Sequence, residues 1–548
     1  MSARSVLCVS AALLVAALAI FATGCGGDTA NADATGAPAE VAKYIPATSP
    51  LYIELDTNID DVQWKNALVL AERFPAYADL EQEFQKELTE ANLDFDTDIR
   101  PLLGGRAAIA ATEVDVKAAS EEFGSDPLGA TRDDLLDEAG FVGVLQLEDG
   151  KDEAVRALIT REGDLTEKGE YNGVTYYADD DDTHGAVTDG FLVIADTEKD
   201  LFVSLDLLAG TGDSLSGVDK FTSALSGLEE GAIARMYVDV GALAAGSLSA
   251  AENDIIDTES ILGDIENAAV GAVTLAEENG LRIKGKTVGL EGQAAAATEY
   301  EPELLERVPG DTVAYVGFAN LSGQAEMLID QLSEGEAAEQ VEQLKQASGQ
   351  LEALLGVTVD DLSALAEGEH AFIVTDDGGK LGVGAALGVE DGTQAGETLE
   401  RLRQAIPAAA GLAGGAAGSG VPEFSAVPLE NGVNGWEAPL NDDFSLVYGV
   451  DDDVVLFGSS ADVVTSMQKP TPTLAQNSGF NAATAGMPEK VTSLLWLDVA
   501  KALKLAEQLG GLDAEEKANL DEVEPLKSIA AWGTGGSEPG FEIFARIE

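Results

Sequence analysis

The feature that most constrains the fold of this 548-residue chain is an internal repeat. A motif of a hydrophobic residue and proline, followed by an apolar run with a central tyrosine, occurs first as Tyr44-Ile45-Pro46 and Leu51-Tyr52-Ile53. It recurs 263 residues later (44 to 307) as Arg307-Val308-Pro309 and Ala314-Tyr315-Val316. Internal similarity at a fixed spacing indicates that one structural unit is present more than once.

Further matches keep the same order along the chain, and their offset changes only where loops differ in length. They pair Leu102 with Leu365, 105–109 with 368–372, 148–150 with 390–392, 172–174 with 431–433, Tyr237 with Trp496, and 280–283 with 540–543. A chain of this length also exceeds one typical domain. The repeat therefore predicts two tandem homologous domains, at residues 41–300 and 301–548.

Within each unit, the hydrophobic pattern mixes the period of a strand with that of a helix. Apolar runs predict strands at 51–55, 106–114 and 141–147, and a hairpin of 270–275 with 281–288. Leu80, Phe84 and Leu88 share one helical face. Because helices mostly return between pairs of strands, we expect the α+β class, with a largely antiparallel sheet in each unit and helices packed on it.

Two other segments complete this pattern. Residues 174–177 and 191–194 are predicted to form a pair of strands with an acidic loop between them. Residues 408–420 are nearly all Ala and Gly and have no counterpart in the first unit. They predict a flexible insertion.

The first 24 residues have the pattern of a signal peptide. A positive start is followed by an apolar run at 6–22, which is shorter than the roughly 20 residues that span a membrane. Ala22-Thr23-Gly24-Cys25 then resembles the lipobox of bacterial lipoproteins, although Ala22 replaces the usual Leu. We expect lipid on Cys25, a flexible tether in 25–40, and export to the outer face of the cytoplasmic membrane or cell envelope. An uncleaved signal anchor and an ordinary secretory signal are the alternatives.

The net charge of the chain limits the classes of molecule that it can bind. There are 99 acidic and 31 basic residues, which gives a formal net charge of −68. Such a body repels phosphate groups, so we expect no nucleic-acid partner. Solubility, or adaptation to a saline or acidic habitat, explains this acidity, and attraction of divalent cations is the functional alternative.

Two motifs resemble ligand sites. The segment 280–287 matches the phosphate-loop pattern G-x4-G-K-T, but its residues alternate as in a strand and no helix follows, so we predict a strand. Asp179-Asp180-Asp181-Asp182 with His184 is the densest set of metal-ligand side chains. It predicts either a solvated hairpin tip or a weak divalent-cation site.

The sequence assigns no catalytic residue, metal ligand or cofactor. It contains no G-x-S-x-G or H-E-x-x-H motif, and its two cysteines, Cys8 and Cys25, both lie in the first 25 residues. The body therefore has neither a disulfide framework nor a thiolate metal site. His184 and His370 are the only histidines. His370 stands on a predicted strand where the first unit has Ala107, which favours a packed or edge histidine.

The repeated opening motif, with Asn172-Gly173-Val174 and the run at 186–196, resembles an uncharacterised bacterial family, domain of unknown function 3352. The resemblance covers most of the chain that remains after signal removal. It implies an exported or membrane-anchored protein, and it carries no catalytic residue over to this chain.

The expected function is that of a noncatalytic cell-envelope lipoprotein with a binding or interaction role. Its ligand would be a small molecule or lipid, held in a groove at the junction of the two domains. One alternative is an envelope hydrolase that uses carboxylates as its catalytic groups. A closely spaced pair of acidic side chains in a cleft would indicate the hydrolase, whereas an apolar groove would indicate a carrier. The other alternative is an acidic spacer or surface component without a ligand.

Overall fold

The structure is a computed structural model. It describes residues 41–90, 93–113, 140–162, 165–179, 183–244, 265–290, 298–323, 356–412, 423–430, 433–441, 444–509, 522–536 and 539–548. The predicted signal peptide, Cys25 and the tether lie outside the described residues.

Twenty strands of the described residues form one continuous antiparallel sheet. The first ten are β1 (Leu51–Asp56), β2 (Leu103–Glu113), β3 (Gly140–Leu147), β4 (Thr166–Tyr171), β5 (Val174–Ala178), β6 (His184–Thr188), β7 (Phe191–Ala195), β8 (Ala234–Asp239), β9 (Ala269–Glu277) and β10 (Gly280–Val288). The others are β11 (Ala314–Ala319), β12 (Glu369–Asp376), β13 (Leu381–Gly388), β14 (Ser425–Pro428), β15 (Asn434–Pro439), β16 (Ser445–Asp451), β17 (Val454–Gly458), β18 (Ser493–Asp498), β19 (Leu526–Thr534) and β20 (Gly540–Ile547).

Helices and short helical turns connect these strands. The helices are α2 (Val62–Ala71), α3 (Pro75–Glu90), α6 (Asp152–Glu162), α7 (Glu198–Leu208), α8 (Asp219–Leu225), α13 (Val359–Ser363), α14 (Gly392–Leu412), α15 (Ala461–Gln468), α16 (Ser478–Ala483) and α17 (Val499–Leu509). The short turns are η1 (Val41–Tyr44), η2 (Phe95–Ile99), η3 (Arg100–Leu102), η4 (Leu215–Gly217), η6 (Glu303–Glu306) and η8 (Leu474–Gln476). None of these helices has the length and hydropathy that crossing a bilayer requires.

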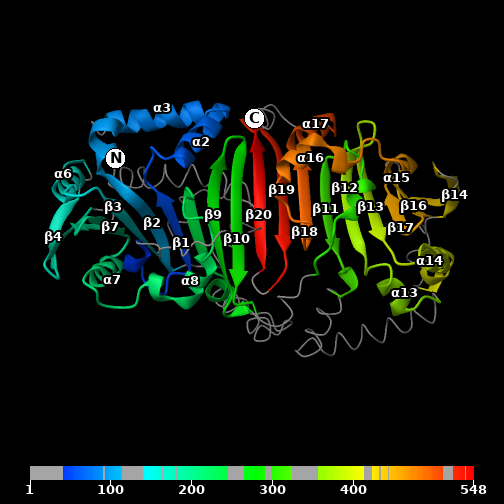
Figure 1. Cartoon of the computed structure of the whole chain (residues 1–548), viewed down its shortest axis with the longest axis horizontal. Helices are drawn as coiled ribbons and strands as arrows, with labels where there is room; N and C mark the ends of the chain where they lie inside the picture. The colour runs from blue at the N-terminus through cyan, green and yellow to red at the C-terminus, as the bar shows by residue number, and fades with distance from the viewer. Residues whose placement is uncertain are drawn as a thin grey trace.

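The order of the strands repeats along the sheet. Read from its outer edge to the middle of the sheet, the first half has the order β4-β5-β6-β7-β3-β2-β1-β8-β9-β10. Read in the same way from the opposite outer edge, the second half has the equivalent order β14-β15-β16-β17-β13-β12-β11-β18-β19-β20. The last strand of each half, β10 and β20, lie side by side in the middle of the molecule (Figure 1). Ile283 and Ile543, which occupy equivalent places in the repeat, are direct cross-strand partners there.

Helices cover both faces of the sheet, and the alternation of side chains along each strand decides which residues they contact. On the first face, Leu201 and Leu205 of α7 pack with Val193 of β7. On the second face, Val155 of α6 packs with Leu192, the preceding residue of β7. The second half repeats this arrangement, because α15 packs with Leu456 of β17 and α14 with Val455.

A charged network joins the two halves on the first face. The guanidinium of Arg282 on β10 pairs with the carboxylates of Glu277 and of Glu542 on β20. It also lies over the ring of Phe544, 4.4 Å from the ring centroid. Arg282 is 7% exposed and Glu542 is 2% exposed, so this ion pair between the halves is buried.

Close packing of α8 on β9 depends on Gly271. A Cβ atom at this position would meet the backbone carbonyl of Ala224 in α8. We expect Gly271→Ala to lower the free energy of unfolding by about 2 kcal/mol, because overpacking forces the helix from the sheet. Denaturant titration measures the effect. Gly231→Ala, which adds a Cβ into open space, is the matched control and should change stability little; equal losses in both variants would contradict this packing argument.

Most predicted elements agree with the structure, and two need correction. The hairpin of β9 and β10 is confirmed, and the phosphate-loop pattern forms strand β10. The prediction that 174–177 pairs with 191–194 is wrong, because β6 lies between β5 and β7 and pairs with both. The predicted insertion is a continuation of helix α14 as far as Leu412, since alanines favour the helix; its remaining residues, 413–420, lie outside the described residues.

Candidate functional site

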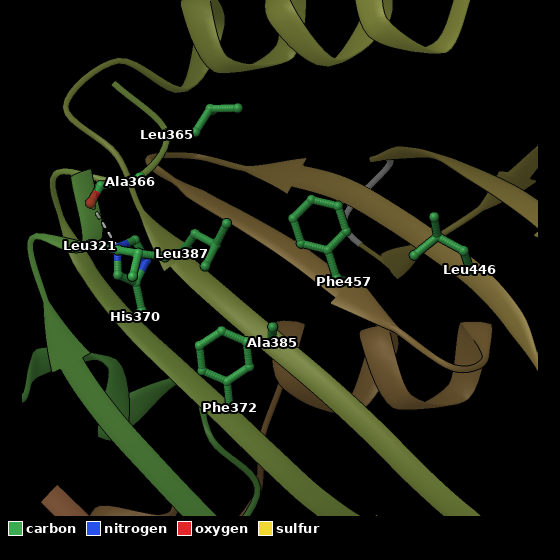
Figure 2. Close-up of a pocket in the computed structure, with 9 residues that line it drawn as sticks. All are labelled: Leu321, Leu365, Ala366, His370, Phe372, Ala385, Leu387, Leu446 and Phe457. Carbon is green, nitrogen blue, oxygen red and sulfur yellow. Dashed lines mark hydrogen bonds between the residues drawn. The ribbon is translucent and has the colours of Figure 1, made fainter. Parts of the chain in front are cut away.

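A cavity of about 410 Å³ lies on the second face of the carboxyl-terminal half of the sheet. Figure 2 shows its lining side chains, which come from β12, β13, β16 and β17 and from the segments beside β11 and α13. They are Leu321, Leu365, Ala366, His370, Phe372, Ala385, Leu387, Leu446 and Phe457. Eight of the nine residues are apolar, and a volume in this range suits a small ligand.

Strand register explains why apolar side chains meet here. Phe372 of β12, Ala385 of β13 and Phe457 of β17 are direct cross-strand partners and therefore project from the same face. The same row continues away from the cavity through Val316 of β11 and Leu495 of β18. Sequence alternation on five strands thus builds one lateral apolar row.

Part of this row is open to solvent. Phe372 and Val316 are each 40% exposed, Leu495 is 42% exposed, and Leu321 at the cavity is 44% exposed. On the far side, Leu399 of α14 packs against the sheet, and Leu365, Leu387 and Phe457 pack around it. The cavity therefore has a packed wall under α14 and an open side toward the exposed row. Exposed apolar side chains gathered in this way indicate a binding surface.

His370 is the single polar side chain of the lining. It is 1% exposed and lies opposite Leu387 in the sheet. Its Nε2 atom is 3.0 Å from the backbone carbonyl of Ala366, and its Nδ1 atom has no hydrogen-bond partner. Burial lowers the pKa of the imidazole, and the Ala366 carbonyl only partly opposes this effect. Burial at the cavity therefore favours the neutral form of this histidine.

The neighbouring carboxylate, Glu369, points to the opposite face. There its Oε2 accepts a hydrogen bond from the backbone N–H of Leu304 at 3.0 Å, and it lies near the buried Tyr300 and Tyr315. Burial raises the pKa of Glu369 to about 7. The acid thus belongs to the core of the first face, and no carboxylate is among the nine residues that line the cavity.

The equivalent place in the first half holds an ion pair. Arg106 stands where the second half has Glu369, and it contacts the buried Glu54 of β1 at 3.2 Å. Tyr52 also donates a hydrogen bond to Glu54, at 2.6 Å. In the second half the residue equivalent to Glu54 is Gly317. The two halves therefore place different charges on the same framework.

The structure describes two residues of the acidic set that the sequence singled out: Asp179 follows β5, and His184 is the cross-strand partner of Ala178 at the end of that strand. Asp179 is buried and accepts a hydrogen bond from the backbone N–H of Thr183 at 2.8 Å, and His184 begins β6. Residues 180–182 and Cys25 lie outside the described residues, so the weak cation site and the lipid attachment stay predictions. Among the residues that the structure describes, no three His, Cys, Asp or Glu side chains are grouped to hold a metal ion.

The groove that the sequence predicted at the junction of the two units stays a prediction. At that junction β10 and β20 are directly hydrogen-bonded, and Leu70 of α2 packs with Leu281 and Ile547 across them. The cavity lies elsewhere, between β12 and β17. His370 is a packed strand residue, as expected, but its place in the cavity was missed. One signal in the sequence could have indicated the cavity: nearly every residue of 370–374 is apolar, so this strand has apolar side chains on both faces.

Comparison with known proteins places this α+β chain in a family. The model of the family described as "Protein of unknown function (DUF3352)" matches residues 6–531, and the chain belongs to that family. A search of curated proteins finds no significant match.

Solved structures of one protein, TP0453, are also similar in part. Its crystal form III is 10% identical, and the match covers 47% of this chain and 88% of that chain with a TM-score of 0.25. Its crystal form I is 11% identical and covers 47% and 80%, with a TM-score of 0.24. Similarity at this level supports no conclusion about function.

Proposed function

We propose that this protein is a noncatalytic, exported lipoprotein, held at the membrane through Cys25, that binds a largely apolar small molecule or lipid chain on the second face of its carboxyl-terminal half. The apolar cavity at Phe372, Ala385 and Phe457 is the observation that carries the binding role. The repeated strand order further supports an origin of the two halves as tandem homologous domains. The alternative of a carboxylate hydrolase lacks such support, because the cavity lining has no carboxylate.

The physical basis of binding is the removal of apolar surface from water. Each square ångström of apolar surface that becomes buried contributes about 25 cal/mol. Phe372 and Leu321 keep roughly two fifths of their surface exposed and would lose it to a ligand. The acidic body would meanwhile repel anionic headgroups, which favours a neutral ligand and makes the lipid on Cys25 necessary for attachment to the membrane.

Binding of the neutral dye Nile red tests this proposal. The full chain with Cys25→Ser should be used, so that no acyl chain of its own competes for the cavity. We expect saturable binding, with a Kd on the order of micromolar. Ala385→Trp fills the middle of the cavity and should weaken binding at least about tenfold, because the ligand's contacts are replaced by the indole.

Ala426→Trp provides the matched control for this substitution. Ala426 is an exposed residue of the edge strand β14 and does not line the cavity, so its variant should bind the dye like the parent chain. Unchanged dye binding in Ala385→Trp would rule out the cavity as the site.

A further inference from the structure

The tautomer of His370 follows from its surroundings. A backbone carbonyl can only accept a hydrogen bond, so the Nε2 atom facing the Ala366 oxygen at 3.0 Å must carry the proton. In the neutral ring, Nδ1 is then an acceptor with a free lone pair. This atom is buried and has no partner, and an unpaired buried acceptor is costly to a fold.

The surroundings of Nδ1 offer no donor of their own from the cavity lining. Leu387 is the cross-strand partner of His370 on one side, and Phe318 is its partner on the other, with the two rings 5.6 Å apart. Figure 2 shows the imidazole among leucine and alanine side chains at one end of the cavity, with its contact to Ala366 drawn. A donor for Nδ1 must therefore come from outside the lining, either from a water molecule or from a ligand.

The chemistry of the cavity selects the kind of donor. The lining contains no Lys or Arg, so a carboxylate or phosphate would be buried without a counter-ion. An ammonium group would have to leave water for a site whose lining offers one side-chain acceptor, Nδ1 of His370, and charged groups lose the most on such transfer. A hydroxyl group carries one donor and no charge, and it loses much less.

Resting on the proposed apolar binding role, we propose that the ligand is a neutral apolar alcohol whose hydroxyl group donates a hydrogen bond to Nδ1 of His370. The hydrocarbon part lies along Phe372, Ala385 and Phe457, and the hydroxyl end lies at His370. The cavity thus distinguishes an alcohol from an equally apolar molecule without an O–H group.

Displacement of Nile red by 1-decanol and by its methyl ether, 1-methoxydecane, tests this inference in the full chain with Cys25→Ser. The ether has the same apolar body but no donor. We expect the preference for the alcohol over the ether to be roughly tenfold greater in the parent chain than in His370→Phe, since one hydrogen bond to an otherwise unpaired acceptor is worth about that much. An equal preference in both proteins overturns the inference and leaves the binding role standing; failure of both compounds to displace the dye contradicts the binding role itself.

A measurement without a cavity variant protects the test against a misfolded His370→Phe protein. The chain has only two histidines, so a sample labelled with [15N]histidine gives two imidazoles, and His184→Gln assigns them. We expect an unprotonated Nδ1 in His370 whose resonance shifts with 1-decanol and not with 1-methoxydecane. A protonated Nδ1, or an unmoved resonance when 1-decanol has displaced the dye, overturns the inference.

Discussion

Replacement of Arg282 by Met should destabilise the protein by about 3–5 kcal/mol, because it leaves a buried carboxylate without its counter-ion. Glu542 on β20 is 2% exposed and pairs with Arg282 on β10. Burial raises the pKa of Glu542 to about 7 against the opposing effect of Arg282. Without Arg282 this acid should take up a proton more readily, so the loss of stability should be smaller at pH 5 than at pH 8.

The double variant Arg282→Met/Glu542→Met separates the ion pair from simple packing. It removes both charges and should recover most of the stability lost in the single variant, since apolar residues often replace a buried ion pair at little cost. Denaturant titration of both proteins at pH 8 measures this difference. If the double variant is as unstable as the single variant, the buried pair does not hold the halves together as described.

Glu369 should make the stability of the protein depend on pH. Its pKa is raised by burial to about 7, from 4.5 in the unfolded chain. Between pH 4.5 and pH 7 the folded protein keeps a proton on Glu369 that the unfolded chain has lost. The stabilisation that this proton gives to the folded state is therefore complete below pH 4.5 and is lost as the pH rises to 7. The difference of pKa corresponds to about 3 kcal/mol.

The substitution Glu369→Gln isolates this contribution from the repulsion of the other acids. Gln keeps the shape of the side chain and does not titrate, so the variant should lack about 3 kcal/mol of the fall in stability between pH 4.5 and pH 8. Glu306→Gln, at an exposed position of η6, is the control and should follow the parent curve. Parallel curves for the parent and Glu369→Gln would show that Glu369 is not buried in its protonated form.

Much of the fold could be predicted because local pattern and repeat agree. The alternation at 51–55 and the turn at Glu278-Asn279 define strands and a hairpin without reference to the rest of the chain. The joining of the halves could not be predicted in this way. Pairing of β10 with β20 depends on which edges stay free after each half has folded, and that is a property of the whole sheet.

This pairing also explains why the halves form one body. Each unit ends in a strand of eight or nine residues that would otherwise expose a row of unpaired N–H and C=O groups. Because β10 and β20 are hydrogen-bonded to each other, neither of these long strands is left as an open edge of the sheet. The strands left at the outer edges are β4 and β14, and both are short, which limits association through them.

The cavity could not be predicted from the sequence, and the physical reason is a different one. Val316, Phe372 and Leu495 are apolar like the core residues beside them, so their strands read as buried on both faces. Only tertiary packing decides that helix α14 covers one end of the row and leaves 40% of Phe372 exposed. The unpaired nitrogen of His370 is likewise a matter of packing, because the sequence does not place Ala366 against Nε2.

Native mass spectrometry of the full chain with Cys25→Ser, produced in its own host, tests the binding role most directly. The parent chain should carry one bound neutral molecule, and its collisional release should identify an apolar compound. Ala385→Trp should lose this molecule and Ala426→Trp should retain it. A parent chain that carries no ligand, or a ligand retained equally by Ala385→Trp, would contradict the assignment of the cavity as a binding site.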